Sequence, residues 1–249
     1  MTDDEELRSE RRTQARSEAV LCDATRAEAF DLALLWPELC SGSRRVVDTF
    51  STDERCYVVI EHSTGPRRRI ANRALGMLER VLVGHSPKVV ASDLSVSVAT
   101  VAGAMRGALG AMGLVCRVSG LPVLVVMSAR AHCTRQSFLA ARLSNLQLDQ
   151  GKVQIVSVPR PDLRLPAHLS NAELSVVRQL VEGCSHAQIS SERGTSARTV
   201  ANQLATAFRK LGVSGRGQLV DRLILYTMDA HRAQRARPEQ LTPEALLSA

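Results

Sequence analysis

LSNAELSVVRQLVEGCSHAQISSERGTSARTVANQLATAFRKLGVSGRGQLVDRLI, residues 169–224, is the stretch that decides the fold, because it divides into four short helices with serines at their starts. Two starts are capping boxes, in which a serine precedes an acidic or amide side chain by three positions: Ser170 with Glu173, and Ser185 with Gln188. Ser196 can cap a third helix, and a fourth is expected over residues 214–226. The pattern predicts a helix-turn-helix unit.

The third helix of this stretch has one apolar and one polar face. Its apolar side chains are spaced four, four and three residues apart and so share a buried face: Val200, Leu204, Phe208 and Leu211. The opposite face carries amide, hydroxyl and cationic groups: Arg198, Thr199, Asn202, Gln203, Arg209 and Lys210. Amides can pair with adenine in the major groove, while cations and hydroxyls can hold phosphates. This helix is therefore predicted to contact DNA.

A fainter copy of the same stretch lies upstream. A shift of 99 positions lays residues 70–117 on residues 169–216 without a gap. Among the matches are Leu75 with Leu174, Ser86 with Ser185, Ser97 with Ser196, Thr100-Val101-Ala102 with Thr199-Val200-Ala201, and Gly113 with Gly212. Internal similarity at a fixed period indicates a repeated structural unit. Two helix-turn-helix units in one chain point to DNA.

Residues 169–224 resemble the LuxR-type helix-turn-helix domain of bacterial transcription regulators. The matching motifs are the L-S-x-x-E-x-x-V opening, the E-G-x-S turn, the I-S that follows it, the S-x-R-T-V start of the third helix, and the closing R-K-L-G-V-x-x-R. The resemblance implies a four-helix domain whose third helix enters the major groove.

The resemblance also implies roles for particular residues. Base contacts are expected from Ala201, Asn202 and Ala205, with flanking contacts from Thr199, Gln203 and Lys210 and further cations at Arg198, Arg209 and Arg216. Many members of the family carry Lys or Arg in place of Ala201 and His in place of Gln203, so base recognition is expected to be weaker or different here. The fourth helix commonly mediates dimerisation, and its candidates are Leu219, Val220, Leu223 and Ile224.

The upstream copy keeps the apolar positions but loses most of the polar face. Gly103 and Gly107 replace Asn202 and Thr206, and Gly110-Ala111 replaces Arg209-Lys210. Thr100, Arg106 and Arg117 are left as candidates for a weak second DNA site. Two interpretations stay open: a degenerate copy that packs or dimerises, and a unit that contacts a second half-site.

The expected fold class is mainly α, with two tandem four-helix LuxR-type units of the winged-helix-like superfamily, each preceded by short β-strands and each with its own core. The expected segments are a disordered charged lead-in (1–17), a helix over 18–36 ended by Pro37 together with a small hairpin (18–65), the degenerate unit (66–127), a connector (128–165), the DNA-binding unit (166–226) and a basic, frayed tail (227–249). The connector is expected to contain a short helix over 136–146 and a strand over 152–158.

Composition narrows the class of protein. The net charge of +7 fits a polyanionic partner such as DNA, although a surplus of this size also occurs in other proteins. The six cysteines include no CxxC pair, so neither a zinc site nor a disulfide framework is expected, and no cofactor or metal is predicted. The N-terminus has no signal-peptide pattern and no window is apolar enough to span a bilayer, so a cytoplasmic protein without membrane contact is expected.

These patterns predict a bacterial transcription regulator, not an enzyme, that binds promoter DNA sequence-specifically through residues 196–211. Double-stranded DNA is the expected partner. A homodimer is expected, and RNA polymerase or another regulator is a further possible partner. The alternative is a module for protein interaction or dimerisation, built from two degenerate units with little DNA binding. A sensor-regulator is a third alternative, for which the first 65 residues are short.

Overall fold

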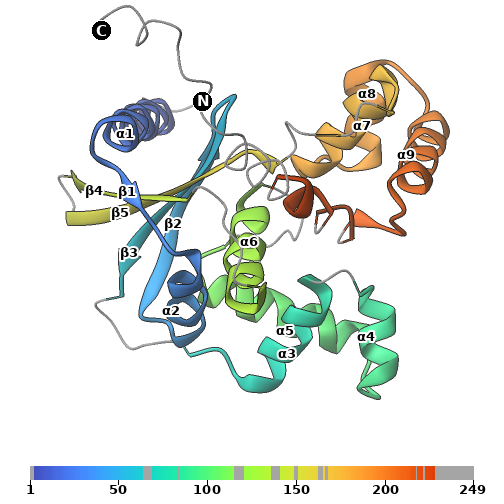
Figure 1. Cartoon of the computed structure of the whole chain (residues 1–249), viewed down its shortest axis with the longest axis horizontal. Coiled ribbons are helices and arrows are strands. Elements are labelled where there is room, and N and C mark those ends of the chain that lie inside the picture. The colour runs from blue at the N-terminus through green and yellow to red at the C-terminus, as the bar shows by residue number, and fades with distance from the viewer. Residues whose placement is uncertain are drawn as a thin grey trace, which may run out of the picture.

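The computed structural model describes residues 3–63, 69–82, 85–114, 121–135, 141–148, 151–161, 165, 168–216, 218–220 and 222–227. The chain is mostly helical with one sheet. The sheet lies to one side, and two groups of three helices lie to the other, with α6 between them (Figure 1).

Two hairpins and a short edge strand form a single antiparallel sheet in the order β1-β4-β5-β3-β2. The strands are β1 (Glu28–Ala29), β2 (Arg44–Ser51), β3 (Arg55–His62), β4 (Arg142–Leu148) and β5 (Gly151–Pro159). This confirms the hairpin and the strand predicted before the two helical units. The hairpins join through β3 and β5, which pair over residues 55–60 and 154–159. These two segments are separated by 99 positions, the same shift that relates the helical units.

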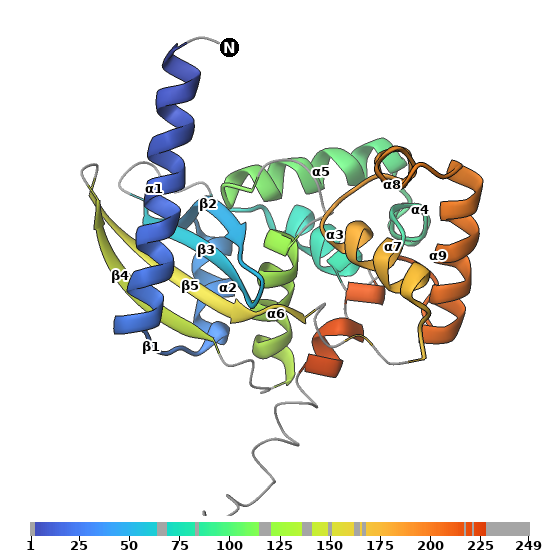
Figure 2. The ribbon, with the colours of Figure 1, turned by 90° about the horizontal axis from the view of Figure 1, so that it is seen from above.

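Helices cover both faces of the sheet (Figure 2). The helix α1 (Asp3–Arg26) packs on one face, while η1 (Leu32–Leu34), α2 (Leu35–Ser41) and α6 (Leu121–Arg135) pack on the other. The alternation along β3 explains this division, because successive side chains of a strand point to opposite faces. Tyr57 clusters with Ala19 and Cys22 of α1, whereas Val58 belongs to the larger core.

Charged side chains attach α1 to the sheet. The guanidinium groups of Arg12 and Arg16 both donate to Asp48 on β2, at 2.5 and 2.8 Å. Asp23 is only 2% exposed, and its carboxylate accepts a hydrogen bond of 2.7 Å from the Ser157 hydroxyl on β5. These contacts give the charged segment a surface to pack on. The prediction of a disordered lead-in over residues 1–17 is therefore wrong from Asp3 onward, where α1 begins.

Two further helix predictions are wrong. The helix predicted over residues 18–36 ends at Arg26, and Pro37 lies in the first turn of α2, where a proline needs no N–H partner. Residues 142–146, predicted as part of a helix, belong to β4 and pair with β5. Pairing with a neighbouring strand overrides local helix propensity there. Residues 136–140 lie outside the described part of the chain.

The two helix groups share one large buried cluster, although a separate core was expected for each. The first group is α3 (Asn72–Leu82), α4 (Pro87–Asp93) and α5 (Val98–Ala111); the second is α7 (Asn171–Val181), α8 (His186–Arg193) and α9 (Ala197–Leu211). Leu78 and Leu109 of the first group and Val177 and Leu204 of the second belong to one buried cluster, which also contains the apolar side chains of α6. A smaller cluster around Met77 lies within the first group.

Among the described residues, no single helix is both long enough and apolar enough to cross a membrane. Taken together, α4 and α5 are long and apolar enough to cross a membrane, but the two helices are bent by 110° relative to each other. In the same described residues, no three His, Cys, Asp or Glu side chains are grouped so that they could hold a metal ion.

Candidate nucleic-acid interface

Reciprocal capping boxes start the first two helices of the C-terminal unit. Ser170 accepts a hydrogen bond from the Glu173 backbone N–H, and the Glu173 carboxylate accepts one from the Ser170 N–H at 2.7 Å. Ser185 and Gln188 form the same pair at the start of α8. These bonds satisfy N–H groups that have no partner within their own helix. Both predicted helix starts are confirmed.

The third helix, α9, is fixed at both ends. Gly194 has φ of 60°, in the left-handed region that favours glycine, and makes the turn from α8. Ser196 then caps α9 by accepting a hydrogen bond of 3.0 Å from the Thr199 N–H. At the other end, Gly212 adopts the left-handed conformation with φ of 64°. The helix is thus held at a defined length and orientation.

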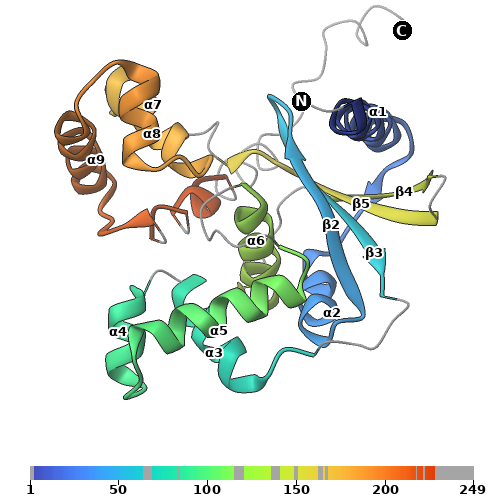
Figure 3. The same ribbon diagram turned by 180° about the vertical axis from the view of Figure 1, so that it is seen from behind.

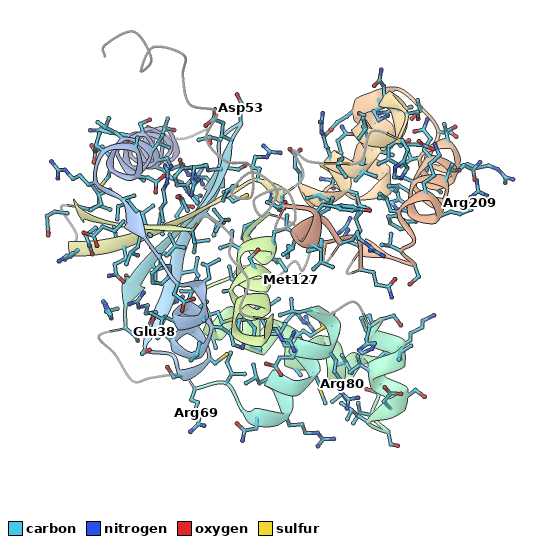
Figure 4. All side chains as sticks on the ribbon, viewed as in Figure 1. Glu38, Asp53, Arg69, Arg80, Met127 and Arg209 are labelled. Atoms are coloured by element: carbon cyan, nitrogen blue, oxygen red, sulfur yellow. The ribbon has the colours of Figure 1, made fainter. Side chains whose placement is uncertain are left out.

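One face of α9 is buried and the other is exposed. The buried side chains are Val200, Leu204, Ala207 and Leu211. Phe208, which was predicted on this face, is only partly buried. The exposed face presents six of the predicted DNA-contacting residues: Arg198, Thr199, Ala201, Asn202, Ala205 and Arg209. Arg209 points away from the rest of the molecule (Figure 4).

Lys210 is exposed at the end of the same helix, but its charge has a partner within the protein. Its ammonium group lies 2.7 Å from the Glu173 carboxylate, the residue that completes the capping box of α7. The hydrogen bonds from Lys210 and from the Ser170 N–H lower the pKa of Glu173 below its ordinary value. This ion pair links the start of α7 to the end of α9, so Lys210 has a structural role that the motif did not reveal.

Arg216 and Gln203 also differ from the other predicted site residues. The Arg216 guanidinium is half-buried and donates a hydrogen bond of 3.0 Å to the backbone carbonyl of Cys184, in the turn between α7 and α8. Burial lowers the pKa of Arg216, although the nearby Cys184 has the opposite effect. Gln203 is partly buried, and its carbonyl oxygen has no hydrogen-bond partner within the described residues.

The fourth helix is buried within the chain. Residues 218–220 and 222–227 are helical and run beside α6 (Figures 1 and 3). The predicted dimerisation residues are among the least exposed of the molecule: Leu219 at 0%, Val220 at 8%, Leu223 at 0% and Ile224 at 1%. They belong to the cluster that contains α6 and the inner face of the sheet. In this structure the predicted dimerisation residues therefore pack within their own chain.

The upstream helices α3, α4 and α5 begin at positions that coincide with those of α7, α8 and α9 after the shift of 99. Polar contacts in the two helix groups also occur at positions related by this shift. Ser97 caps α5 as Ser196 caps α9, with bonds of 3.0 Å in both cases. An ion pair between Arg80 and Asp93 takes the place of the hydrogen bond between Gln179 and Glu192. The repeat in sequence therefore extends to boundaries and contacts.

The exposed face of α5 differs in chemistry from that of α9. Gly103, Gly107 and Gly110 face open space, since a Cβ atom added to any of them would have no neighbour within 4 Å. Thr100 is exposed and bonded through its hydroxyl to Ser97, and Arg106 is also exposed on α5. Arg117, the third candidate of this unit, lies outside the described residues.

Comparison with known families identifies the C-terminal unit. Residues 167–223 match the family described as "Bacterial regulatory proteins, luxR family". No curated protein and no solved structure matches the chain in the same comparisons. The matched range spans α7, α8, α9 and most of the fourth helix, which includes the capped, polar face described above. Residues 167–223 are therefore a LuxR-type helix-turn-helix unit, of the kind found in DNA-binding transcription regulators.

Proposed function

We propose that this chain regulates bacterial transcription by binding promoter DNA through the exposed face of α9. The observation that carries the proposal is the combination of this polar face with fixed helix ends inside a LuxR-type unit. Arg198 and Arg209 lie near the two ends of α9 and are both exposed, so they supply phosphate contacts that orient the helix. Asn202 lies between them and supplies the base contact.

The centre of the exposed face favours A·T base pairs. An asparagine amide pairs bidentately with adenine N6 and N7, and an alanine methyl group packs against the thymine methyl group. Ala201 and Ala205 flank Asn202 on the exposed side of α9. The binding site is therefore expected to contain adenine opposite Asn202 with thymine beside it.

The upstream unit acts as a scaffold in this proposal. It has the helix boundaries and caps of a second helix-turn-helix unit, but α5 offers three glycines and a single arginine on its exposed surface. Phosphate contacts from cations supply much of the free energy of DNA binding, so this surface contributes little affinity. The unit instead shares its core with α6 and the C-terminal unit.

The experiment is selection of bound fragments from a random duplex library by the full chain, followed by titration of the selected duplex and of a scrambled duplex. Asn202→Ala is expected to weaken binding to the selected duplex by about 1–3 kcal/mol, which is roughly 5- to 150-fold, and to leave binding to scrambled DNA unchanged. Arg106→Ala, on α5, is the matched control and should change neither affinity.

Two results would contradict the proposal. Equal losses by Asn202→Ala on selected and scrambled duplexes would show that Asn202 does not contact a base. If the chain binds neither duplex at low salt, the C-terminal unit does not bind DNA, and the interaction-module alternative would then be favoured.

A further inference from the structure

A cavity of about 620 Å³ lies at the junction of the first helix group, α6 and the C-terminal unit. Its apolar walls come from all three parts: Val81 and Met105, Val123 and Met127, and Val181 and Val220. Each of these residues is at most 8% exposed. Figure 4 labels Met127 on α6, between the two helix groups. The volume falls within the range of pockets that enclose drug-sized ligands, about 300–1,000 Å³.

Arg216 gives this apolar cavity one cationic edge. It lines the cavity and is half-buried, and one of its nitrogens donates to the Cys184 carbonyl. Among the described residues, no carboxylate forms an ion pair with it. A partly desolvated cation without a counter-ion is unfavourable, and a planar guanidinium can donate two parallel hydrogen bonds to a carboxylate. The cavity therefore combines apolar walls with an open position for an anion.

We propose that this cavity binds a small amphiphile with one carboxylate head and an apolar body of roughly 8–15 non-hydrogen atoms. The carboxylate pairs with the Arg216 guanidinium, and the apolar body lies against Val123, Met127 and the other wall residues. A purely apolar ligand would offer no partner to the Arg216 guanidinium, and a highly charged ligand would not suit the apolar walls.

Binding at this position would bridge parts of the chain that are far apart in sequence. The wall formed by Arg216 and Val220 follows directly after α9, and the opposite wall belongs to the first helix group. A ligand that binds the folded chain stabilises the arrangement it contacts. The position of the C-terminal unit relative to the first helix group is thus linked to occupancy of the cavity.

The test is isothermal titration calorimetry of the full chain, without DNA, using decanoate as the probe and decanol as its uncharged counterpart. Decanoate is expected to bind saturably and at least about tenfold more tightly than decanol, a typical difference for a charge-assisted contact. Arg216→Met should abolish this difference. Arg222→Met is the matched control and should preserve the difference, because Arg222 is an exposed arginine of the fourth helix that does not line the cavity.

A second variant tests the location and protects against simple misfolding. Val220→Phe places a larger apolar side chain at the cavity wall, so it should weaken both probes at least about tenfold, and a cooperative thermal unfolding transition of the same variant shows that it still folds. The proposal is overturned if the native chain binds neither probe, if Val220→Phe binds decanoate as well as the native chain does, or if Arg222→Met has the same effect as Arg216→Met. Because no DNA is present, the result is independent of the proposed regulatory function.

Discussion

Neighbouring cations on α9 have different environments although they are adjacent in sequence. Arg209 is exposed, and no salt bridge involving it is found in the described part of the chain, whereas the Lys210 ammonium lies 2.7 Å from the Glu173 carboxylate. A lysine that is already paired offers less attraction to a phosphate, since its partner must be displaced or must share it. Arg209 is therefore expected to contact a DNA phosphate, whereas Lys210 is expected to stay paired with Glu173.

Salt dependence distinguishes the two residues. Arg209→Met is expected to reduce the slope of log affinity against log salt by about 1, because one phosphate contact is lost. Lys210→Met is expected to leave the slope nearly unchanged. Titration of the selected duplex at four or more salt concentrations, by fluorescence anisotropy, gives both slopes. An equal reduction in both variants would mean that Lys210 leaves Glu173 and contacts DNA.

At the scale of single elements, α1 depends on one carboxylate of β2. Partial burial of Asp48 opposes its ionisation, but hydrogen bonds from Arg16 and Arg12 outweigh burial and lower its pKa from 3.8 to about 2. A carboxyl group whose pKa is lower in the folded state stabilises the fold above its unfolded pKa. That contribution is therefore complete above about pH 5 and is lost as the pH falls from about 4 to about 2.

Asp48→Asn is expected to lower the free energy of unfolding at pH 7 by about 1–2 kcal/mol, after allowance for the exposure of Arg12. The same variant should lose less stability than the native chain between pH 4 and pH 2. Asp53→Asn, in the exposed turn between β2 and β3, is the control and should follow the native curve. Urea unfolding at several pH values measures both effects. Parallel pH curves for the native chain and Asp48→Asn would contradict the role of this ion pair.

The glycines of α5 provide another test at this scale. Gly103 and Gly107 lie inside a helix and face open space, so alanine at both positions should raise the free energy of unfolding by about 1–2 kcal/mol in total. Gly113→Ala should do the opposite, because Gly113 has φ of 84° and its added Cβ would collide with the Val46 carbonyl. Urea unfolding of the native chain, of Gly103→Ala/Gly107→Ala and of Gly113→Ala measures these changes in the free energy of unfolding. No gain in Gly103→Ala/Gly107→Ala would mean that the open face of α5 is covered in solution.

Local elements with their own signals were predictable from the sequence, and contacts between distant segments were not. The serine caps and Gly194 mark the ends of α7, α8 and α9, because capping involves residues only a few positions apart. The pairing of β3 with β5 joins residues about a hundred positions apart, and no local pattern specifies it. Lys210 with Glu173 is a similar case, since the two residues are 37 positions apart.

At the scale of the whole molecule, the two repeats are joined within one chain. β3 and β5 pair along the middle of the sheet, and the fourth helix of the C-terminal unit shares a core with α6. The surface that the family resemblance assigned to a partner chain is thus occupied by the same chain. We therefore infer that one copy binds one half-site, with α9 as its DNA-contacting helix.

Leu223 tests this inference, because a core residue and a dimer-interface residue respond differently to truncation. Leu223→Ala is expected to lower the free energy of unfolding by about 2–5 kcal/mol at all protein concentrations, since a fully buried leucine is replaced by a cavity. The native chain should run at the monomer mass of 27.0 kDa in light scattering, and titration of the selected duplex should saturate at one chain per duplex. Arg222→Ala, on the exposed side of the same helix, is the control and should change neither stability nor mass. A native dimer that Leu223→Ala converts to a stable monomer would show that the fourth helix opens to pair with a second copy.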